Sequence, residues 1–103
     1  MIKLIFFVPA GYKEKVKNAL FEIGAGSIGS YKQCSFEVEG VGQFCPGSDA
    51  NPFIGNTEKL EKVREFKVEM VMKNELVKIA KETLIKVHPY ETPAYEFYEI
   101  IDV

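Results

Sequence analysis

The sequence has little of what marks several large classes of protein. Lys and Arg number 13 against 15 Asp and Glu, so the formal net charge is −2 and the pI is near 5.5. Nucleic-acid binders usually carry a basic excess, and anionic membranes attract basic segments, so neither partner is expected. The only sizeable unbroken apolar run, residues 4–10, is far too short to span a bilayer.

Cysteine and histidine are also scarce. Two cysteines do not make a disulfide scaffold, and no cleavage site of a signal peptide follows the first apolar run. We therefore expect a cytoplasmic protein with reduced thiols. With one histidine, and without a G-x-S-x-G or Walker motif, the sequence does not indicate an enzyme.

Residues 24–29 match the letters of the dinucleotide-binding motif G-x-G-x-x-G. That motif works only between a strand and the start of a helix, where free N–H groups meet the phosphates. Here an amphipathic helix precedes the glycines, with apolar residues spaced as Val16, Ala19, Leu20 and Ile23. We interpret the segment as a turn after a helix, with Gly24 as its left-handed end residue.

The length and the side-chain patterns predict one domain over residues 1–103. The patterns indicate a central strand at 2–8 and further strands at 66–73 and 95–101. A second helix carries Val77, Ala80, Leu84 and Val87, follows Asn74 as its N-cap and ends before Pro89. Residues 31–38 and 41–45 are predicted to form a hairpin with a tight turn at Glu39-Gly40.

That hairpin would place Cys34 opposite Cys45, within disulfide reach. The pair would be either two small buried residues or a redox or soft-metal site. The predicted order is β-α-β-β-β-α-β, an α+β ferredoxin-like sandwich with both helices on one face of an antiparallel sheet. The helix-free face is then partly apolar, which predicts that copies of the chain cover it.

The long loop at 46–58 is the first candidate for binding. Structureless loops of this length are uncommon in small domains and often carry function. Phe53 and Ile54 are expected to be pinned against the body or against a neighbouring subunit. The candidate ligand-binding residues are Asn51, Pro52, Phe53, Gly55 and Tyr90.

Residues 88–93 read His-Pro-Tyr-Glu-Thr-Pro, which resembles the motif before the last strand of CutA-type divalent-cation-tolerance proteins. The fuller pattern resembles the insert domain of the NGG-interacting-factor-three-like proteins of the YqfO type. It extends over blocks at 8–12, 24–31, 34–36, 40–44, 50–55 and 88–95.

This resemblance implies a fold related to CutA and PII signalling proteins, which assemble as trimers with their sheets facing inward. It also implies that the chain is the insert alone, without the metal ligands of its longer relatives, so their enzyme label does not transfer. The function expected is a non-catalytic trimeric binding or regulatory module with a small-molecule or protein partner.

Two alternatives stay open. One is a zinc- or copper-binding protein that uses His88 and Glu91, with help from Tyr90, Cys34 or Cys45. Against it, Pro89 keeps His88 and Glu91 off a shared helical face, and two ligands are fewer than a stable site uses. His88 could instead simply end the helix, with its ring bonded to a carbonyl. The other alternative is a module selected only to oligomerise.

Overall fold

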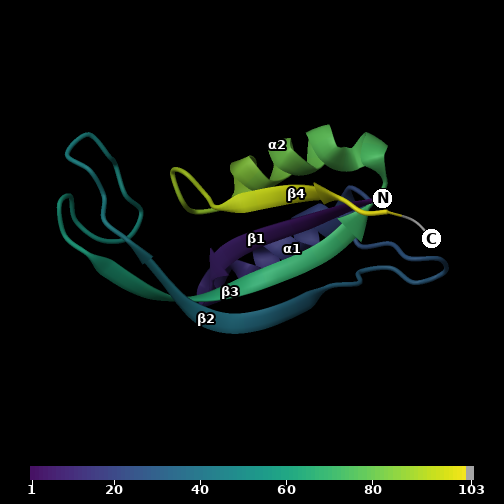
Figure 1. Ribbon diagram of the computed structural model, residues 1–103, viewed down its shortest axis with the longest axis horizontal. Coiled ribbons are helices and arrows are strands. Elements are labelled where there is room, and N and C mark those ends of the chain that lie inside the picture. The colour runs from purple at the N-terminus through teal and green to yellow at the C-terminus, as the bar shows by residue number, and fades with distance from the viewer. Residues whose placement is uncertain (102–103) are drawn as a thin grey trace.

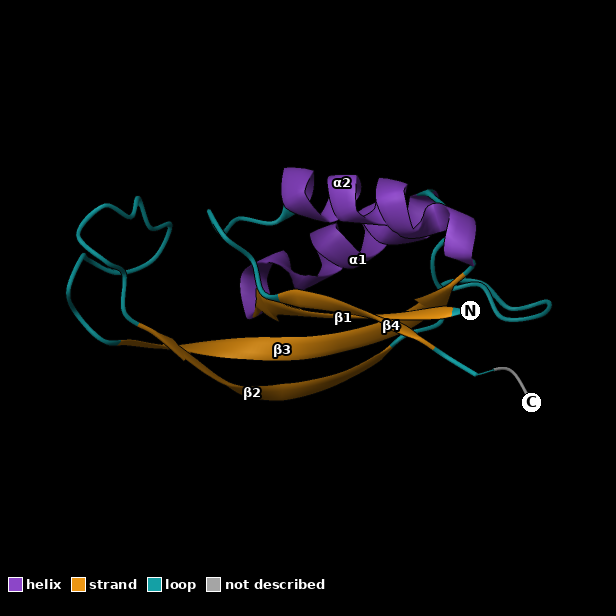
Figure 2. Cartoon of the chain, turned by 45° about the horizontal axis from the view of Figure 1, so that its top comes forward, coloured by secondary structure: helices purple, strands orange, loops and turns teal. Residues whose placement is uncertain are grey.

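The framework of the protein is an antiparallel sheet with two helices on one face (Figures 1 and 2). The computed structural model describes residues 1–101. The strands are β1 (Ile2–Pro9), β2 (Phe36–Phe44), β3 (Glu61–Met72) and β4 (Tyr95–Glu99), in the order β2-β3-β1-β4 across the sheet. Helix α1 (Lys13–Glu22) follows β1, and α2 (Val77–Val87) follows β3. This arrangement confirms the ferredoxin-like α+β fold.

Alternation along the two central strands builds the core. In the pairs Phe6↔Val68 and Leu4↔Met70, side chains of β1 and β3 that face each other across the ladder point together toward the helices. The helices contribute fully buried residues from their apolar stripes. The fully buried members of this core are Leu4, Phe6, Val8, Val16, Leu20, Val68, Ala80 and Leu84.

Short turns set the entry and exit of each helix. The 3-10 turns η1 (Ala10–Tyr12) and η2 (Asn74–Leu76) precede α1 and α2. The predicted N-cap at Asn74 is wrong, because Asn74 begins η2 and the residue before α2 is Leu76, which makes no side-chain cap bond. After α1, Gly24 has φ +103, as its predicted position at the helix end requires. At the end of α2, His88 is already extended, with ψ 138, because Pro89 follows it.

The predicted hairpin at Glu39-Gly40 is wrong. Strand β2 runs unbroken through both residues and pairs with β3 from Phe36↔Glu69 to Phe44↔Glu61. The physical reason is the length of β3, which starts at Glu61 and so offers a partner to every residue of β2. The β2–β3 pair is itself the hairpin, and the described chain has four strands where five were predicted.

Because that hairpin does not form, the predicted pairing of Cys34 with Cys45 is wrong as well. Cys34 and Cys45 lie just beyond opposite ends of β2, a strand of 9 residues. Extended chain advances about 3.4 Å per residue, so the strand between the two cysteines is by itself roughly 30 Å long, far beyond disulfide reach. They are free cysteines and not cross-strand neighbours.

No helix within residues 1–101 is long and apolar enough to cross a membrane.

Candidate functional site

The loop at 46–58 is closed on itself and folded against the connection between α2 and β4. Its neck is held by the Glu58 N–H, which donates to the Pro46 carbonyl at 2.6 Å. Compact loops with joined ends are often functional. The Asn51 N–H donates to Glu91 Oε1 at 3.1 Å and so ties the loop to the other connection. Figure 1 shows both segments at the same end of the molecule.

A pocket of about 200 Å³ lies between these two segments. Its walls are mostly apolar and aromatic, and they come from the end of β2, the loop and the α2–β4 connection. The lining residues are Phe44, Pro46, Ala50, Pro52, Phe53, Ile54, Tyr90, Glu91 and Thr92.

The structure brings most of the predicted site residues together. Pro52, Phe53 and Tyr90 line this pocket, and Glu91, predicted as a metal ligand, lines it too. Asn51 instead lines a neighbouring hollow on the other side of the Phe53–Tyr90 contact. Gly55 lines neither hollow. Its φ of +91 and its close approach to Glu61 give it a role in shaping the loop.

Tyr90 is the centre of an aromatic cluster. Its ring centroid lies 6.1 Å from that of Phe44 and 6.4 Å from that of Phe53. Tyr12, from the turn before α1, meets Phe53 edge-on at 5.4 Å. Aromatic pairs at such distances stabilise their contacts beyond simple burial. Phe53 thus contacts the body of its own chain, which is one of the two outcomes the sequence predicts, while half of its surface stays exposed.

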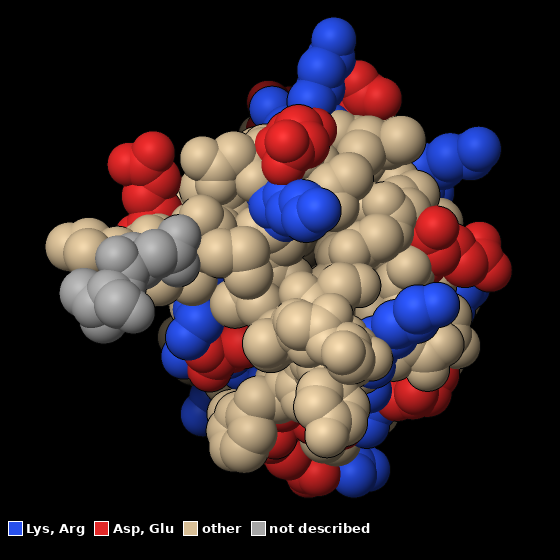
Figure 3. All heavy atoms as spheres, turned by 90° about the vertical axis from the view of Figure 1, so that its right-hand side faces the viewer, with Lys and Arg blue, Asp and Glu red and all other residues tan. Residues whose placement is uncertain are grey.

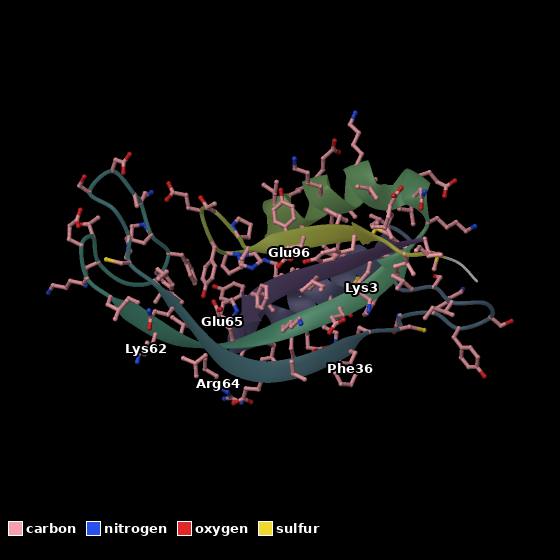
Figure 4. The ribbon with its side chains drawn as sticks, in the orientation of Figure 1. Lys3, Phe36, Lys62, Arg64, Glu65 and Glu96 are labelled. Atoms are coloured by element: carbon pink, nitrogen blue, oxygen red, sulfur yellow. The ribbon has the colours of Figure 1, made fainter. Side chains whose placement is uncertain are left out.

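The hydroxyl of Tyr90 reaches past the pocket to a buried carboxylate. It donates to Glu65 Oε2 at 2.5 Å, and Glu65 is only 9% exposed. The carboxylate lies directly over Gly42 of the neighbouring strand, where a Cβ would fall 1.9 Å from Glu65 Oε1. Burial, together with this hydrogen bond, raises the pKa of Tyr90 far above its ordinary value, so the phenol stays protonated. Figure 4 labels Glu65 on β3.

His88 is buried beneath Tyr90, with both ring nitrogens engaged. Nε2 lies 2.7 Å from the Phe7 carbonyl oxygen, which can only accept, so Nε2 carries the proton. Nδ1 accepts the Tyr90 backbone N–H at 3.1 Å. The ring is therefore the neutral Nε2–H tautomer, and it fixes the end of α2 to β1.

This arrangement does not fit a metal held by His88 and Glu91. A metal at His88 would have to displace either the Phe7 carbonyl or the Tyr90 N–H, and Glu91 is bonded to the loop at Asn51. No cluster of three or more His, Cys, Asp or Glu able to hold an ion occurs in the described part of the chain. Zinc or copper binding by this pair stays a prediction that the geometry does not favour.

Acid should weaken the fold through His88. Burial lowers the pKa of its imidazole, and the Phe7 carbonyl and Glu65 offset only part of that effect. The unfolded chain therefore binds a proton at a higher pH than the folded chain does. The contribution of neutral His88 to the free energy of unfolding is complete above the pKa of about 6.5 that the imidazole has in the unfolded chain. It decreases as the pH drops toward the lower pKa of the folded chain, by at most about 1.4 kcal/mol per pH unit.

Urea unfolding at several pH values between 7.5 and 5.5 measures this loss. The lowered carboxylate pKa values of Glu37 and Glu39 act below this range, and His88 is the only histidine. The variant His88→Gln should be less stable at pH 7.5 and should lose the slope. An unchanged slope in that variant contradicts the assignment.

Three residues of the site escaped the sequence prediction. Glu65 was missed because the alternation of β3 is clear only from Phe66 onward, and the charged residues before it hide the first part of the strand. Phe44 had been placed in the wrong hairpin. Tyr12 falls within a block of the family resemblance, but nothing in its spacing indicates a contact with Phe53.

Comparison by sequence finds proteins named GTP cyclohydrolase 1 type 2 homolog, and comparison by structure finds NIF3-related and CutA proteins. The chain is 44% identical over 98 residues to the "GTP cyclohydrolase 1 type 2 homolog" of Bacillus subtilis, covering 95% of this chain and 26% of that protein. It superposes on a Bacillus cereus protein related to NIF3 with a TM-score of 0.84 and 34% identity, over 98% of this chain and 26% of the other. No family model matches the chain.

CutA1 from Pyrococcus horikoshii shares the fold, with a TM-score of 0.73 and 21% identity over 100% of this chain and 86% of that one. The chain thus spans nearly all of a CutA protein but only about a quarter of the length of the curated relatives that it matches. The chain is therefore homologous to the CutA-like segment of the NIF3-related proteins, whose curated members are named GTP cyclohydrolase 1 type 2 homologs.

Proposed function

We propose that the chain is a non-catalytic, trimeric binding module of the CutA/PII-like type, with its small-molecule pocket between the 46–58 loop and Tyr90. The observation that carries self-association is the face of the sheet that the helices leave open. We define this open face by the side chains of β1, β2, β3 and β4 that alternate away from the helices. Its apolar members are Ile5, Phe7, Phe36, Val38, Val71 and Tyr98.

Several of these side chains meet solvent in the single chain. Phe36 is 65% exposed, Tyr98 48% and Val38 46%. Near the two termini, Ile28 and Phe36 border a hollow whose floor includes Val71. Figure 3 looks at this end of the molecule and shows uncharged residues over much of it, with one basic and one acidic side chain in its upper middle and further charges toward its margins. Several exposed apolar side chains gathered on one face are typical of an interface.

The charges at the centre of the open face are partly paired within the chain. Glu69 Oε1 pairs with the Lys3 ammonium at 3.3 Å, and Glu69 Oε2 lies 3.9 Å from the Lys67 ammonium. The two lysines share this one carboxylate, so a second copy that covers the group must supply a further acid or leave one ammonium group in water. The strand β2 also has a free edge, which isolated proteins usually protect. A second and third copy are the occupants that this face suits.

Light scattering at micromolar concentration tests the proposal. We expect about three times the chain mass of 11.7 kDa. Val38→Asp should give single chains, because it places a charge in the middle of the open face. Val41→Asp is the matched control, since Val41 lies on the same strand, alternates to the other face and is 74% exposed. A monomeric parent chain, or equal dissociation by both variants, would contradict the proposal.

The pocket supports binding more than catalysis. Its lining offers apolar and aromatic contacts, one carboxylate and one threonine hydroxyl, and the described residues bring no basic group beside that hydroxyl to activate it. The curated relatives carry a cyclohydrolase-homolog name, but they are almost four times as long as the part this chain matches. A binding role is therefore the function that the geometry of this segment supports.

A further inference from the structure

The pocket between the 46–58 loop and Tyr90 has mostly aromatic and apolar walls. Phe44, Phe53 and Tyr90 all line it, with the Phe44 and Phe53 centroids each within 6.4 Å of the Tyr90 centroid. The Phe44 and Phe53 rings are tilted from the Tyr90 ring by 56° and 49°, so they do not stack flat on it, and all three rings line one hollow. A group seated in it lies within about 6 Å of more than one ring, the range over which an aromatic face attracts a cation.

The charges around the pocket have one sign. Glu91 is the ionised side chain among the lining residues, and no Lys, Arg or His lines the pocket in the described chain. The segments that form it, 46–58 and 88–94, carry Asp49, Glu58 and Glu91 but no lysine or arginine. A phosphate or carboxylate ligand would therefore find no counter-charge here, whereas a cation would.

Glu91 is held in a position to act on a ligand. Its Oε1 accepts the Asn51 N–H, which fixes the carboxylate at the rim, and Oε2 remains available. The Tyr90 ring is fixed independently by its bond to Glu65 and by its N–H bond to His88. These hydrogen bonds hold the Glu91 carboxylate and the Tyr90 ring in place before any ligand arrives. Binding then loses less conformational entropy.

We infer that this pocket binds a small organic cation, an ammonium group carried on an apolar body, through the rings of Phe44, Phe53 and Tyr90 and the carboxylate of Glu91. The inference rests on the proposed function, because it names the ligand class of the same pocket. A volume of about 200 Å³ suits an ammonium group with short alkyl substituents better than a nucleotide.

Choline and its uncharged isostere 3,3-dimethylbutan-1-ol are the probes, because they share a shape and differ in charge. Titration of the full chain followed by amide NMR should shift the resonances of residues 50, 51, 53, 54 and 90–92. We expect choline to bind about tenfold more tightly than the isostere, the difference that a partly desolvated cation over aromatic rings provides. Inorganic phosphate should leave these resonances unmoved.

Two variants and one control locate the effect. Glu91→Gln keeps an oxygen for the Asn51 N–H but removes the charge, and Phe53→Leu keeps apolar bulk but removes a ring. Each should weaken choline binding about threefold, a part of the tenfold preference, and leave the isostere nearly unchanged. Glu82→Gln, an exposed acid on α2, changes the net charge equally and should have no effect.

The outcomes separate this inference from the proposed function. Equal affinity for choline and the isostere overturns the cation inference but leaves a binding pocket. Phosphate binding at these residues, or no shift with choline at tens of millimolar, also overturns it. Light scattering on the same samples reports the oligomeric state, so a monomer that binds choline overturns the trimer and keeps the cation site.

Discussion

Gly42→Ala should destabilise the protein by about 1.5–3 kcal/mol, the contribution of a hydrogen bond to a charged group. Gly42 lies outside the positive-φ region, so alanine fits its backbone conformation. The new methyl group, however, would fall 1.9 Å from Glu65 Oε1 and 2.5 Å from Glu65 Cδ. The carboxylate must move, and it then loses the Tyr90 hydroxyl that it accepts at 2.5 Å.

Gly40→Ala is the matched control for this prediction. Gly40 lies two residues earlier on the same strand and the same face, and a Cβ there meets nothing within 4 Å. Alanine also suits a strand slightly better than glycine does, so this variant should match or exceed the parent in stability. Urea denaturation of both variants measures the difference. Equal midpoints would show that Glu65 adapts without loss.

The fold could be predicted from the sequence where side-chain patterns are regular. The apolar strand at the N-terminus, the alternation from Phe66 onward and the two apolar helix stripes all have their expected places in the structure. These elements form the core, and burial in a core is what makes a pattern regular. Gly24 and Pro89 also mark helix ends correctly, because each constrains its own stretch of backbone.

The edge strand β2 could not be predicted in the same way. Its burial pattern is mostly exposed, and glycines at positions 40 and 42 resemble a turn. Its course is set by pairing with β3 and by long-range ion pairs. Glu37 receives the Lys13 and Lys17 ammonium groups of α1, and Glu39 receives the Arg64 guanidinium. Such contacts depend on the assembled fold and leave no periodic trace in the sequence.

The candidate site, too, could be predicted only in part. The loop and the 88–93 motif could be identified because proline, glycine and aromatic residues cluster there, and the structure does place them together. Their chemistry could not be foreseen. His88 and Glu91 are three residues apart in the sequence, yet one faces β1 and the other bonds to the loop. The partner of Tyr90, Glu65, is 25 residues away, so only the tertiary fold reveals it.

Tyr90→Phe should also destabilise the protein by about 1.5–3 kcal/mol while leaving the pocket walls in place. The substitution keeps the ring against Phe44 and Phe53 but removes the hydroxyl, so the buried carboxylate of Glu65 loses its donor. Leaving a buried charged acceptor without its partner costs more than the same loss at a surface. Tyr31→Phe is the control, since that ring is 75% exposed.

Combining Tyr90→Phe with Gly42→Ala tests whether both act through the same bond. If they do, the double variant should be only slightly less stable than either single one, because the hydrogen bond can be lost only once. Additive losses would mean that Gly42→Ala disturbs the β2–β3 pairing and not the carboxylate. Because Tyr90 lines the pocket and Glu65 borders the open face beside Gly42, a strong coupling would show that one hydrogen bond joins the pocket to the open face of the sheet.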